Sequence, residues 1–276
     1  MVNYSIIIPH RGAPELLHRL LVSIPQRPDV QVIVIEDPEG RGGGYARNQA
    51  LPQATGRWLL FADADDFYAD GFLDVLDTYV DRTDIDVVYF GFQMVAADTL
   101  APEPIVTAGY IQDYDGSAAA EARVRFGINS PWCKMIRAEL VKAHHLRFDE
   151  TSIANDRFFS LQVGHFARRI AVEKCVLYNY VHYPASQTNR QWNRAKVRDL
   201  LQVTLRSNAF LRSIGHPELC RRLLNLWLEA LREGGFRRFW LLTQAYLTLN
   251  FWSSERKQAC LICRVVTKVS EANFEH

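Results

Sequence analysis

Three carboxylates, Asp63, Asp65 and Asp66, crowd into four positions directly after the apolar run 58–61. A short apolar run bounded by polar residues is typical of a buried strand, so these acids are expected where the strand ends in a loop. Carboxylates this close raise each other's pKa unless a cation or hydrogen-bond donors compensate. A divalent metal that also holds a diphosphate would compensate, because hard cations take oxygen ligands from both partners. The pattern fits an acidic helix N-cap as well.

Two more polar clusters follow apolar runs of the same kind. Residues 10–12 (His-Arg-Gly) come after the run 4–9, and Glu36-Asp37 comes after the run 30–35. Strands are predicted over 4–9, 30–35, 58–62 and 86–92, and helices over 14–23, 45–53 and 72–80. This alternation predicts a right-handed, mostly parallel α/β sheet. Ligands of such sheets bind at the carboxyl ends of the strands, which is where all three clusters fall.

The second half of the chain is more helical. The pattern weakens over 94–116, and it then predicts helices over 117–126, 138–144 and 153–166 and one or two strands over 170–183. Beyond Trp192 almost everything is helical in pattern, with breaks at 215–217 and at Gly234-Gly235. The composition changes near residue 190. We therefore predict one domain over 1–190 and a helical region over 191–276.

Composition excludes several classes of protein. The 276 residues carry a net charge of +1, so no nucleic-acid partner is expected. No basic stretch followed by a long apolar run indicates a signal peptide, and no apolar run is long enough to span a bilayer. The stretch 239–252 fits a core helix or an interfacial membrane helix. Five cysteines, among them the lone pair Cys260 and Cys263, indicate neither a disulfide framework nor a zinc site. A cytoplasmic protein is expected.

The usual glycine-based nucleotide motifs are absent. The first predicted strand is not followed by G-x-G-x-x-G, and no G-x-x-x-x-G-K-[ST] occurs. The glycine run 42–44 lacks a following Lys-Ser/Thr and fits a flexible turn as well as a phosphate loop. We therefore expect a nucleotide held by carboxylates and a metal.

Four segments in order carry a family resemblance: Y-S-I-I-I-P at 4–9, V-I-V-I-E-D at 32–37, G-Y-A-R-N-Q-A at 44–50 and G-R-W-L-L-F-A-D-A-D-D at 56–66. Together they resemble the nucleotide-binding half of glycosyltransferase family 2. The resemblance covers roughly 3–190 and implies an α/β fold of the GT-A type, a Rossmann-like sheet flanked by helices, here with a helical C-terminal extension. The segments W-C-K-M-I-R at 132–137 and Y-N-Y-V-H at 178–182, with Ser186, resemble parts of bacterial capsule and lipopolysaccharide members.

The resemblance implies a set of donor contacts. The residues expected to meet the nucleotide-sugar are Pro9, Arg11, Glu36, Asp37, Arg47, Asp63 and Asp65. Glu36 departs from the usual Asp-Asp pair, which leaves the donor base open, with uracil as the first choice. The D-x-D pair would place Asp65 on a divalent ion, Mn²⁺ or Mg²⁺, with Asp66 and His182 as further ligands. Arg47 fits a donor contact and a helix-surface arginine equally.

The general base is expected before a helix at 155–156. Family members that invert the anomeric centre take their base from a Glu-Asp pair there, and this chain has Asn155-Asp156. Asp156 is our predicted base, with an exposed helix-cap aspartate as the alternative. Losing the neighbouring acid should lower the pKa of Asp156.

Three other residues have two readings each. Trp132 would stack on a sugar or pack in the core, and Lys134 would meet the acceptor or diphosphate or lie on the surface. His182 would bind the metal or diphosphate, or serve the structure alone.

We therefore expect a metal-dependent, inverting glycosyltransferase that moves a sugar from a UDP-sugar to a hydroxyl of a glycan or lipid-linked glycan acceptor. A nucleotidyltransferase is the enzymatic alternative. A non-catalytic nucleotide-sugar-binding or assembly subunit is the other, and Asn155 is the one feature in its favour. The C-terminal helices fit three roles: shaping the acceptor site, forming a homodimer, or docking on the inner face of the membrane.

Overall fold

The computed structural model describes residues 1–183 and 192–255. The chain divides into two compact units. The first holds Met1–Glu150 and Asn155–Ser186, and the second holds Thr151–Ala154 and Gln187–His276. Ser186, Cys260 and Cys263, which the sequence singled out, lie outside the described residues.

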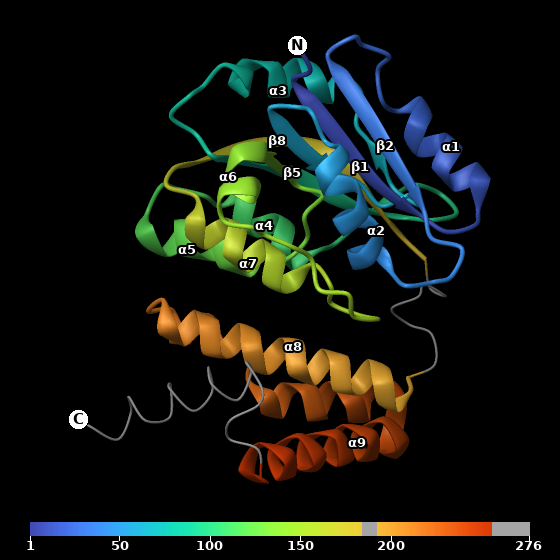
Figure 1. The fold of residues 1–276 in the computed structure, drawn as a ribbon, viewed down its shortest axis with the longest axis vertical. Coiled ribbons are helices and arrows are strands. Elements are labelled where there is room, and N and C mark those ends of the chain that lie inside the picture. Colours follow the sequence, from blue (N-terminus) through green and yellow to red (C-terminus); the bar gives the residue numbers. More distant parts are fainter. Residues whose placement is uncertain (184–191, 256–276) are drawn as a thin grey trace. The chain divides into compact units, whose positions relative to one another are not determined.

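The first unit is built on one mixed sheet (Figure 1). Its strands are β1 (Tyr4–His10), β2 (Val30–Glu36), β3 (Trp58–Phe61), β4 (Phe67–Tyr68), β5 (Val87–Ala96), β6 (Pro102–Glu103), β7 (Lys134–Arg137) and β8 (Ile170–His182). They follow the order β2-β1-β3-β7-β5-β8-β4, and β6 pairs with β5. β1 is parallel to β2 and β3, and β5 is parallel to β8, whereas β7 is antiparallel to both its neighbours. The expected α/β fold with its helical extension is confirmed.

The helices of this unit alternate with the strands. They are α1 (Pro14–Val22), α2 (Gly43–Ala50), α3 (Phe72–Val80), α4 (Val106–Gln112), α5 (Ala118–Gly127), α6 (Ala138–Ala143) and α7 (Arg157–Phe166). Every helix predicted before residue 190 is present, with shifted ends. The sequence did not indicate α4, which follows two prolines and has no side-chain cap, nor the four-residue β7.

The centre of the sheet is apolar on both faces. Ile6, Ile7 and Ile8 of β1 are fully buried, as are Leu60 and Phe61 of β3. Continuous apolar strands are typical of parallel strands covered on both sides. The parallel register pairs Ile7 with Phe61, so the ends of β1 and β3 lie at the same edge.

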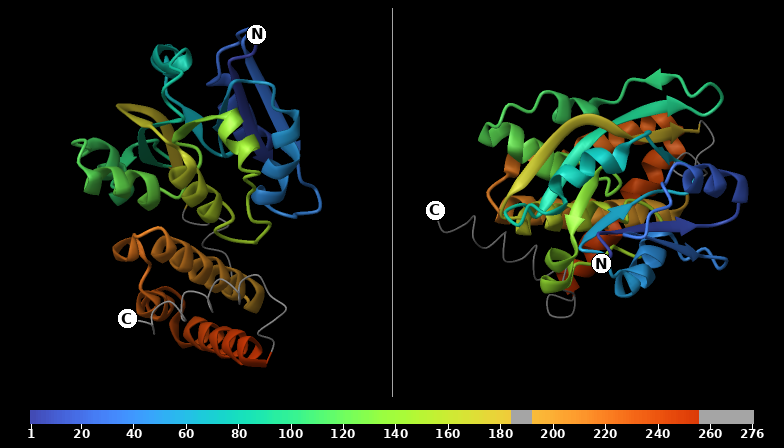
Figure 2. Two further views of the ribbon diagram at one scale, coloured as in Figure 1. Left: turned by 60° about the vertical axis from the view of Figure 1, so that its left-hand side comes forward. Right: turned by 90° about the horizontal axis from the view of Figure 1, so that it is seen from above.

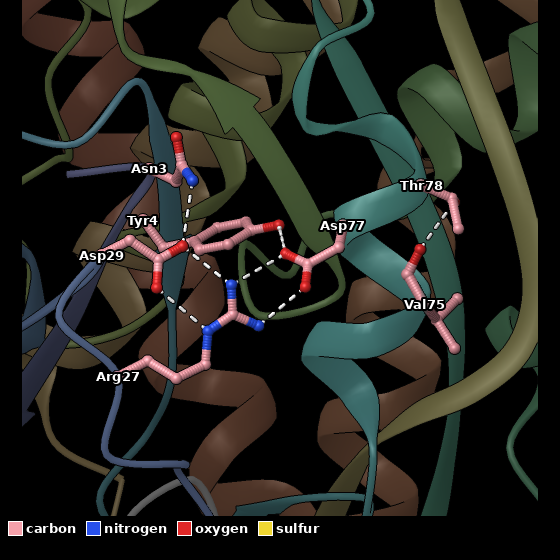
Figure 3. A network of polar contacts seen from close by, with 7 residues as sticks. All are labelled: Asn3, Tyr4, Arg27, Asp29, Val75, Asp77 and Thr78. Atoms are coloured by element: carbon pink, nitrogen blue, oxygen red, sulfur yellow. Dashed lines mark hydrogen bonds and ion pairs between the residues drawn. The ribbon is translucent and has the colours of Figure 1, made fainter. Parts of the chain in front are cut away.

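A network of polar contacts fastens the opposite edge (Figure 3). Arg27 donates from Nη1 to Oδ2 of Asp77 at 2.7 Å and from Nη2 to Oδ2 of Asp29 at 2.7 Å. The Tyr4 hydroxyl donates to Oδ1 of Asp77 at 2.7 Å, and Asn3 donates to Asp29 at 2.9 Å. Arg27 lowers the pKa of Asp29 to about 2. The network joins the starts of β1 and β2 to α3. It lies at the end of the sheet opposite to the carboxyl ends of these strands, where the candidate site residues lie.

The second unit is helical. It contains α8 (Arg194–Ser213), a short 3-10 turn (Pro217–Leu219) and α9 (Leu223–Glu255). Trp227 Nε1 donates to Thr243 Oγ1 at 3.1 Å, and the Trp227 ring lies 5.5 Å from that of Tyr246. A straight helix would separate residues 16 apart by about 24 Å, so α9 folds back between them. That interval contains the predicted break at Gly234-Gly235.

The two arms of α9 and the helix α8 share a core of their own (Figure 2). Its buried members are Val197, Leu201, Leu226, Ala230 and Leu242. No helix in the described part of the chain combines the length and the apolar character needed to cross a membrane.

Candidate active site

The carboxyl ends of β1 and β2 bring two polar residues into contact. The parallel register places His10 opposite Glu36, and His10 Nδ1 lies 2.5 Å from Glu36 Oε1. His10 is 6% exposed, and its Nε2 is buried without a hydrogen-bond partner among the described residues. Pro9 precedes it on the strand and is half-buried. The sequence analysis gave His10 no separate role. Each of the two residues ends its strand six positions after the strand begins, so parallel pairing of the two strands already brings them together.

Asp37 organises the glycine-rich loop that follows β2. Its carboxylate accepts hydrogen bonds from the backbone of Gly42 at 2.7 Å and of Arg41 at 3.0 Å. Burial raises the pKa of Asp37, but these two N–H groups and the charge of Arg11 lower it further, so that the net shift is downward. The Arg11 guanidinium lies against Gly40, where an added Cβ would come within 2.4 Å of it. This edge of the sheet therefore keeps a charged carboxylate.

The three acids after β3 have different environments. Asp66 is fully buried, where it accepts from the Tyr178 hydroxyl at 2.7 Å and from the backbone of Val181 at 2.8 Å. Burial, and then the charges of Asp63 and Asp65, raise its pKa well above the usual range. Both of its oxygens thus fasten the loop to β8. This differs from the expected metal contact, because a ligand atom must be free to face the ion.

Asp65 is the acid of the three that is free to bind a ligand. It is half-buried, and burial followed by the charge of Asp63 raises its pKa to about 6. The backbone N–H of Asp65 and the charge of Arg19 lower this pKa in part, and the Asp65 backbone carbonyl accepts from Arg19. The conflict between neighbouring acids that the sequence predicts is therefore present at Asp65 and is only partly relieved.

Arg47 links the two halves of the site. This residue of α2 is 5% exposed, and it donates from Nη2 to Asp63 and from Nη1 to Oδ1 of Asn155 at 3.0 Å. Its guanidinium also lies over the Phe148 ring, 5.2 Å from the centroid. Glycine at position 44 lets α2 lie close to the backbone of Asp149, since a Cβ there would lie 1.9 Å from the Asp149 carbonyl oxygen. Arg47 is thus a buried bridge and not a surface arginine.

Asp156 begins α7 next to this bridge. It occupies the N-cap position, but its side chain makes no capping hydrogen bond. Burial raises the pKa of Asp156 most, and Asp63 adds to this, while Arg47 and Lys134 lower it, so that the net shift is upward. The fall expected from losing a neighbouring acid is outweighed by burial. A carboxylate that makes no capping hydrogen bond and has a raised pKa is suited to accept a proton.

Lys134 and Trp132 lie inside the protein. Lys134 is fully buried, where its ammonium donates to the carbonyls of Ile128, at 2.9 Å, and Ser130. Neither the expected ligand contact nor the surface alternative describes it, because the backbone carbonyls already surround its charge. Trp132 is 5% exposed and stacks on the Tyr178 ring with centroids 4.9 Å apart. It therefore packs in the core.

His182 ends β8 on the far side of the sheet order from β1. Its Nδ1 lies 2.9 Å from Glu103 Oε2 of β6, and its side chain is 38% exposed. The other ring nitrogen has no hydrogen-bond partner among the described residues. The Glu103 contact orients the ring, which leaves Nε2 as the atom able to meet a ligand.

The carboxylates at this site could hold a divalent metal only together with ligand atoms from a substrate. Within the described ranges, no three His, Cys, Asp or Glu side chains gather to hold an ion by themselves. Asp65 offers a carboxylate with a raised pKa, which an adjacent cation would lower. Mg²⁺ and similar ions are commonly held by one or two carboxylates together with substrate phosphates. The residues therefore fit an ion shared with a diphosphate, with Asp65 as the protein ligand.

The architecture matches solved structures of GT-A enzymes. The structure of S. aureus TarS 1–349 in complex with UDP-GlcNAc superposes with a TM-score of 0.65 at 18% identity, covering 88% of this chain and 79% of that one. A Pyrobaculum calidifontis mannosyltransferase, PcManGT, in complex with GDP-Man and Mn²⁺ gives a TM-score of 0.51 at 16% identity, covering 99% and 81%. These likenesses establish the class of fold.

The family follows from the sequence comparison. Residues 21–144 match the model of Glycosyl transferase family 2, so the chain carries a domain of that family. Bacillus subtilis "Putative glycosyltransferase EpsH" is 28% identical over 186 residues, which is 65% of this chain and 53% of that protein. B. subtilis "Uncharacterized glycosyltransferase EpsJ" is 25% identical over 233 residues, 82% and 66%. The chain thus spans between half and two thirds of the length of these relatives.

Proposed function

We propose that this protein transfers a sugar from a nucleotide-sugar, a UDP-sugar in the first instance, to a hydroxyl of a glycan acceptor with inversion at the anomeric carbon. The observation that carries the proposal is the set of three carboxylates with different pKa shifts at the ends of β2 and β3 and the start of α7: charged Asp37 in its loop, Asp65, and Asp156 with its raised pKa. Carboxylates held at different pKa values supply the separate roles of ligand and base. The UDP-GlcNAc bound by the similar TarS structure supports the choice of uridine.

The donor would bind along the ends of β1, β2 and β3. Asp37 and Arg11 would border the base, and Asp63, which Arg47 holds, would border the ribose. Asp65 would hold a divalent ion, Mn²⁺ or Mg²⁺, against the diphosphate. Such an ion neutralises the negative charge that develops on the leaving nucleoside diphosphate. Glu36 would act through His10, with which it pairs.

Asp156 would take the proton of the attacking hydroxyl. Burial keeps this carboxylate basic, while the charges of Arg47 and Lys134 oppose part of the rise in its pKa. Asn155 holds Arg47 through its amide oxygen and so contributes orientation without a second negative charge. The acceptor glycan, free or lipid-linked, would approach on this side of the site.

The first test is UDP binding by calorimetry, with Mn²⁺ and then with a chelator. Wild type and Asp74→Asn, an exposed aspartate of α3, should bind with metal, whereas Asp65→Asn should bind at least about tenfold more weakly. A second readout is UDP release from UDP-sugars with water as acceptor. Asp156→Asn should keep UDP affinity and lose about 100-fold or more in release rate. Wild type that binds neither UDP nor other nucleoside diphosphates would refute the proposal.

A further inference from the structure

The helical unit contains a surface cavity that the sugar-transfer proposal does not use. It has a volume of about 390 Å³ and is lined by α8 and the second half of α9. The lining residues are Arg194, Phe236, Arg237, Trp240, Leu241 and Gln244. Two cations, three apolar side chains and one amide thus surround one hollow, and no acid lines it.

Large apolar side chains stand exposed beside this cavity. Phe236 is 71% exposed, Trp240 50% and Leu247 60%. At 100° per residue these three positions fall within an arc of about 40° on the helix, so they form a single stripe. The rings of Phe236 and Trp240 lie nearly parallel with centroids 6.4 Å apart. Contiguous exposed aromatic groups of this kind mark a surface that meets a partner.

Three exposed cations of the same unit are unpaired among the described residues. Arg194, Arg198 and Arg237 are exposed, and none of them makes an ion pair with a described residue. Other arginines, among them Arg27, Arg47 and Arg221, are paired with acids. The sequence also divides its charge unevenly. Residues 192–276 carry fourteen Lys and Arg against seven Asp and Glu, whereas residues 1–191 carry eighteen against twenty-four.

We propose that this Arg-aromatic face, formed by Arg194, Arg198, Phe236, Arg237, Trp240 and Leu247, binds the surface of an anionic lipid bilayer. The guanidinium groups contact headgroup phosphates, and the stripe enters the boundary between headgroups and acyl chains. Arginine beside Trp, Phe and Leu is the composition that interfacial helices use. Trp and Tyr favour this boundary because one part of the ring system is apolar and the other donates hydrogen bonds.

The chemistry of the face favours a bilayer over other occupants. Free phosphate would satisfy the arginines and leave the exposed stripe in water. A second copy of this chain related by twofold symmetry would bring like charges together, which is unfavourable. A bilayer with anionic lipids supplies both the negative charge and the apolar layer. The proposal that this face binds a bilayer does not depend on the proposed sugar transfer.

The test is co-sedimentation of the full chain with vesicles of phosphatidylcholine, with and without phosphatidylglycerol. We expect binding to the anionic vesicles that weakens as salt is raised, and little binding to the neutral ones. The double variant Arg194→Glu/Arg237→Glu should bind about tenfold or more weakly. Phe236→Ser/Trp240→Ser should lose binding to a similar extent, because it removes the buried apolar area.

Matched controls keep the result specific. Arg123→Glu/Lys142→Glu makes the same change of net charge at exposed positions of the first unit and should bind like wild type. Leu224→Ser/Leu228→Ser removes exposed leucines, 68% and 46% exposed, outside the face and should also bind like wild type. Circular dichroism checks that each variant is folded. Equal binding to neutral and anionic vesicles, equal losses in the controls, or a wild-type dimer that the face variants convert to monomer would overturn the proposal.

Discussion

Arg47 and Asn155, 108 positions apart in the sequence, are joined by a hydrogen bond of 3.0 Å from Nη1 to Oδ1. The same guanidinium donates through Nη2 to Asp63. Because position 155 is a neutral amide, Arg47 can bond to Asn155 and still pair its charge with Asp63 alone. The departure from the usual acidic pair therefore has a structural reason that the sequence did not reveal.

Replacing Asn155 with aspartate should raise the pKa of Asp156 further. A second negative charge would lie beside Asp156 and draw Arg47 toward itself, and both changes disfavour the ionised base. Activity is lost as pH falls through the pKa of the base, so the acidic limb of UDP release should move to higher pH. Rates measured from pH 4 to 9, with Asn155→Ser as the neutral control, check this. An acidic limb that stays in place would show that position 155 does not act on Asp156.

Arg47→Met should lower the free energy of unfolding by about 2–3 kcal/mol, because the buried guanidinium and its bonds to the partly buried Asp63 and to Asn155 are lost. Arg82→Met breaks an exposed pair with Asp84 and should cost under about 1 kcal/mol. Urea unfolding of both variants gives the comparison. Similar losses in the two would mean that the Arg47 pair acts like a surface pair.

Lys134→Met should destabilise the fold by about 2–4 kcal/mol and leave nucleotide binding intact. The carbonyls of Ile128 and Ser130 would lose their donor inside the core, which is costly for buried polar groups. Urea unfolding measures the first effect, and UDP titration at low temperature measures the second. Normal stability with lost UDP affinity would restore Lys134 as a ligand contact.

The network at Asp29 predicts a pH dependence of stability. Arg27 lowers the pKa of Asp29 to about 2 in the folded protein, below the value near 4 of an unfolded chain. Its contribution is therefore complete above about pH 4 and is lost as pH falls toward 2. Solvent screening limits it to about 1 kcal/mol or less. In urea unfolding at pH 6 and pH 3, Asp29→Asn should show a smaller drop than wild type. An equal drop would mean that other carboxylates account for the loss.

Much of the fold was predictable because several strands are continuous apolar runs in the sequence. The ends of β1, β2 and β3 gather the acids at one edge, as the rule for parallel strands requires. β7 was missed because four residues give no periodic signal, and its antiparallel direction depends on distant partners.

The site was less predictable, since local sequence says nothing about which oxygens are already bonded. Asp65 and Asp66 are neighbours of the same type, yet Tyr178 and Val181, more than 110 positions away, occupy the second and leave the first free. The burial of Lys134 and Arg47 likewise depends on long-range packing. Hydrogen-bond partners of this kind are a property of the folded chain.

The fold-back of α9 also bears on how the protein is made. Trp227 completes its packing only when Thr243 and Tyr246 are present, about sixty residues after the end of β8 at His182. During synthesis, N-terminal domains generally fold first. The last strand of the sheet therefore leaves the ribosome while the helical unit still lacks its second arm, so the sheet can be complete before the helical unit assembles.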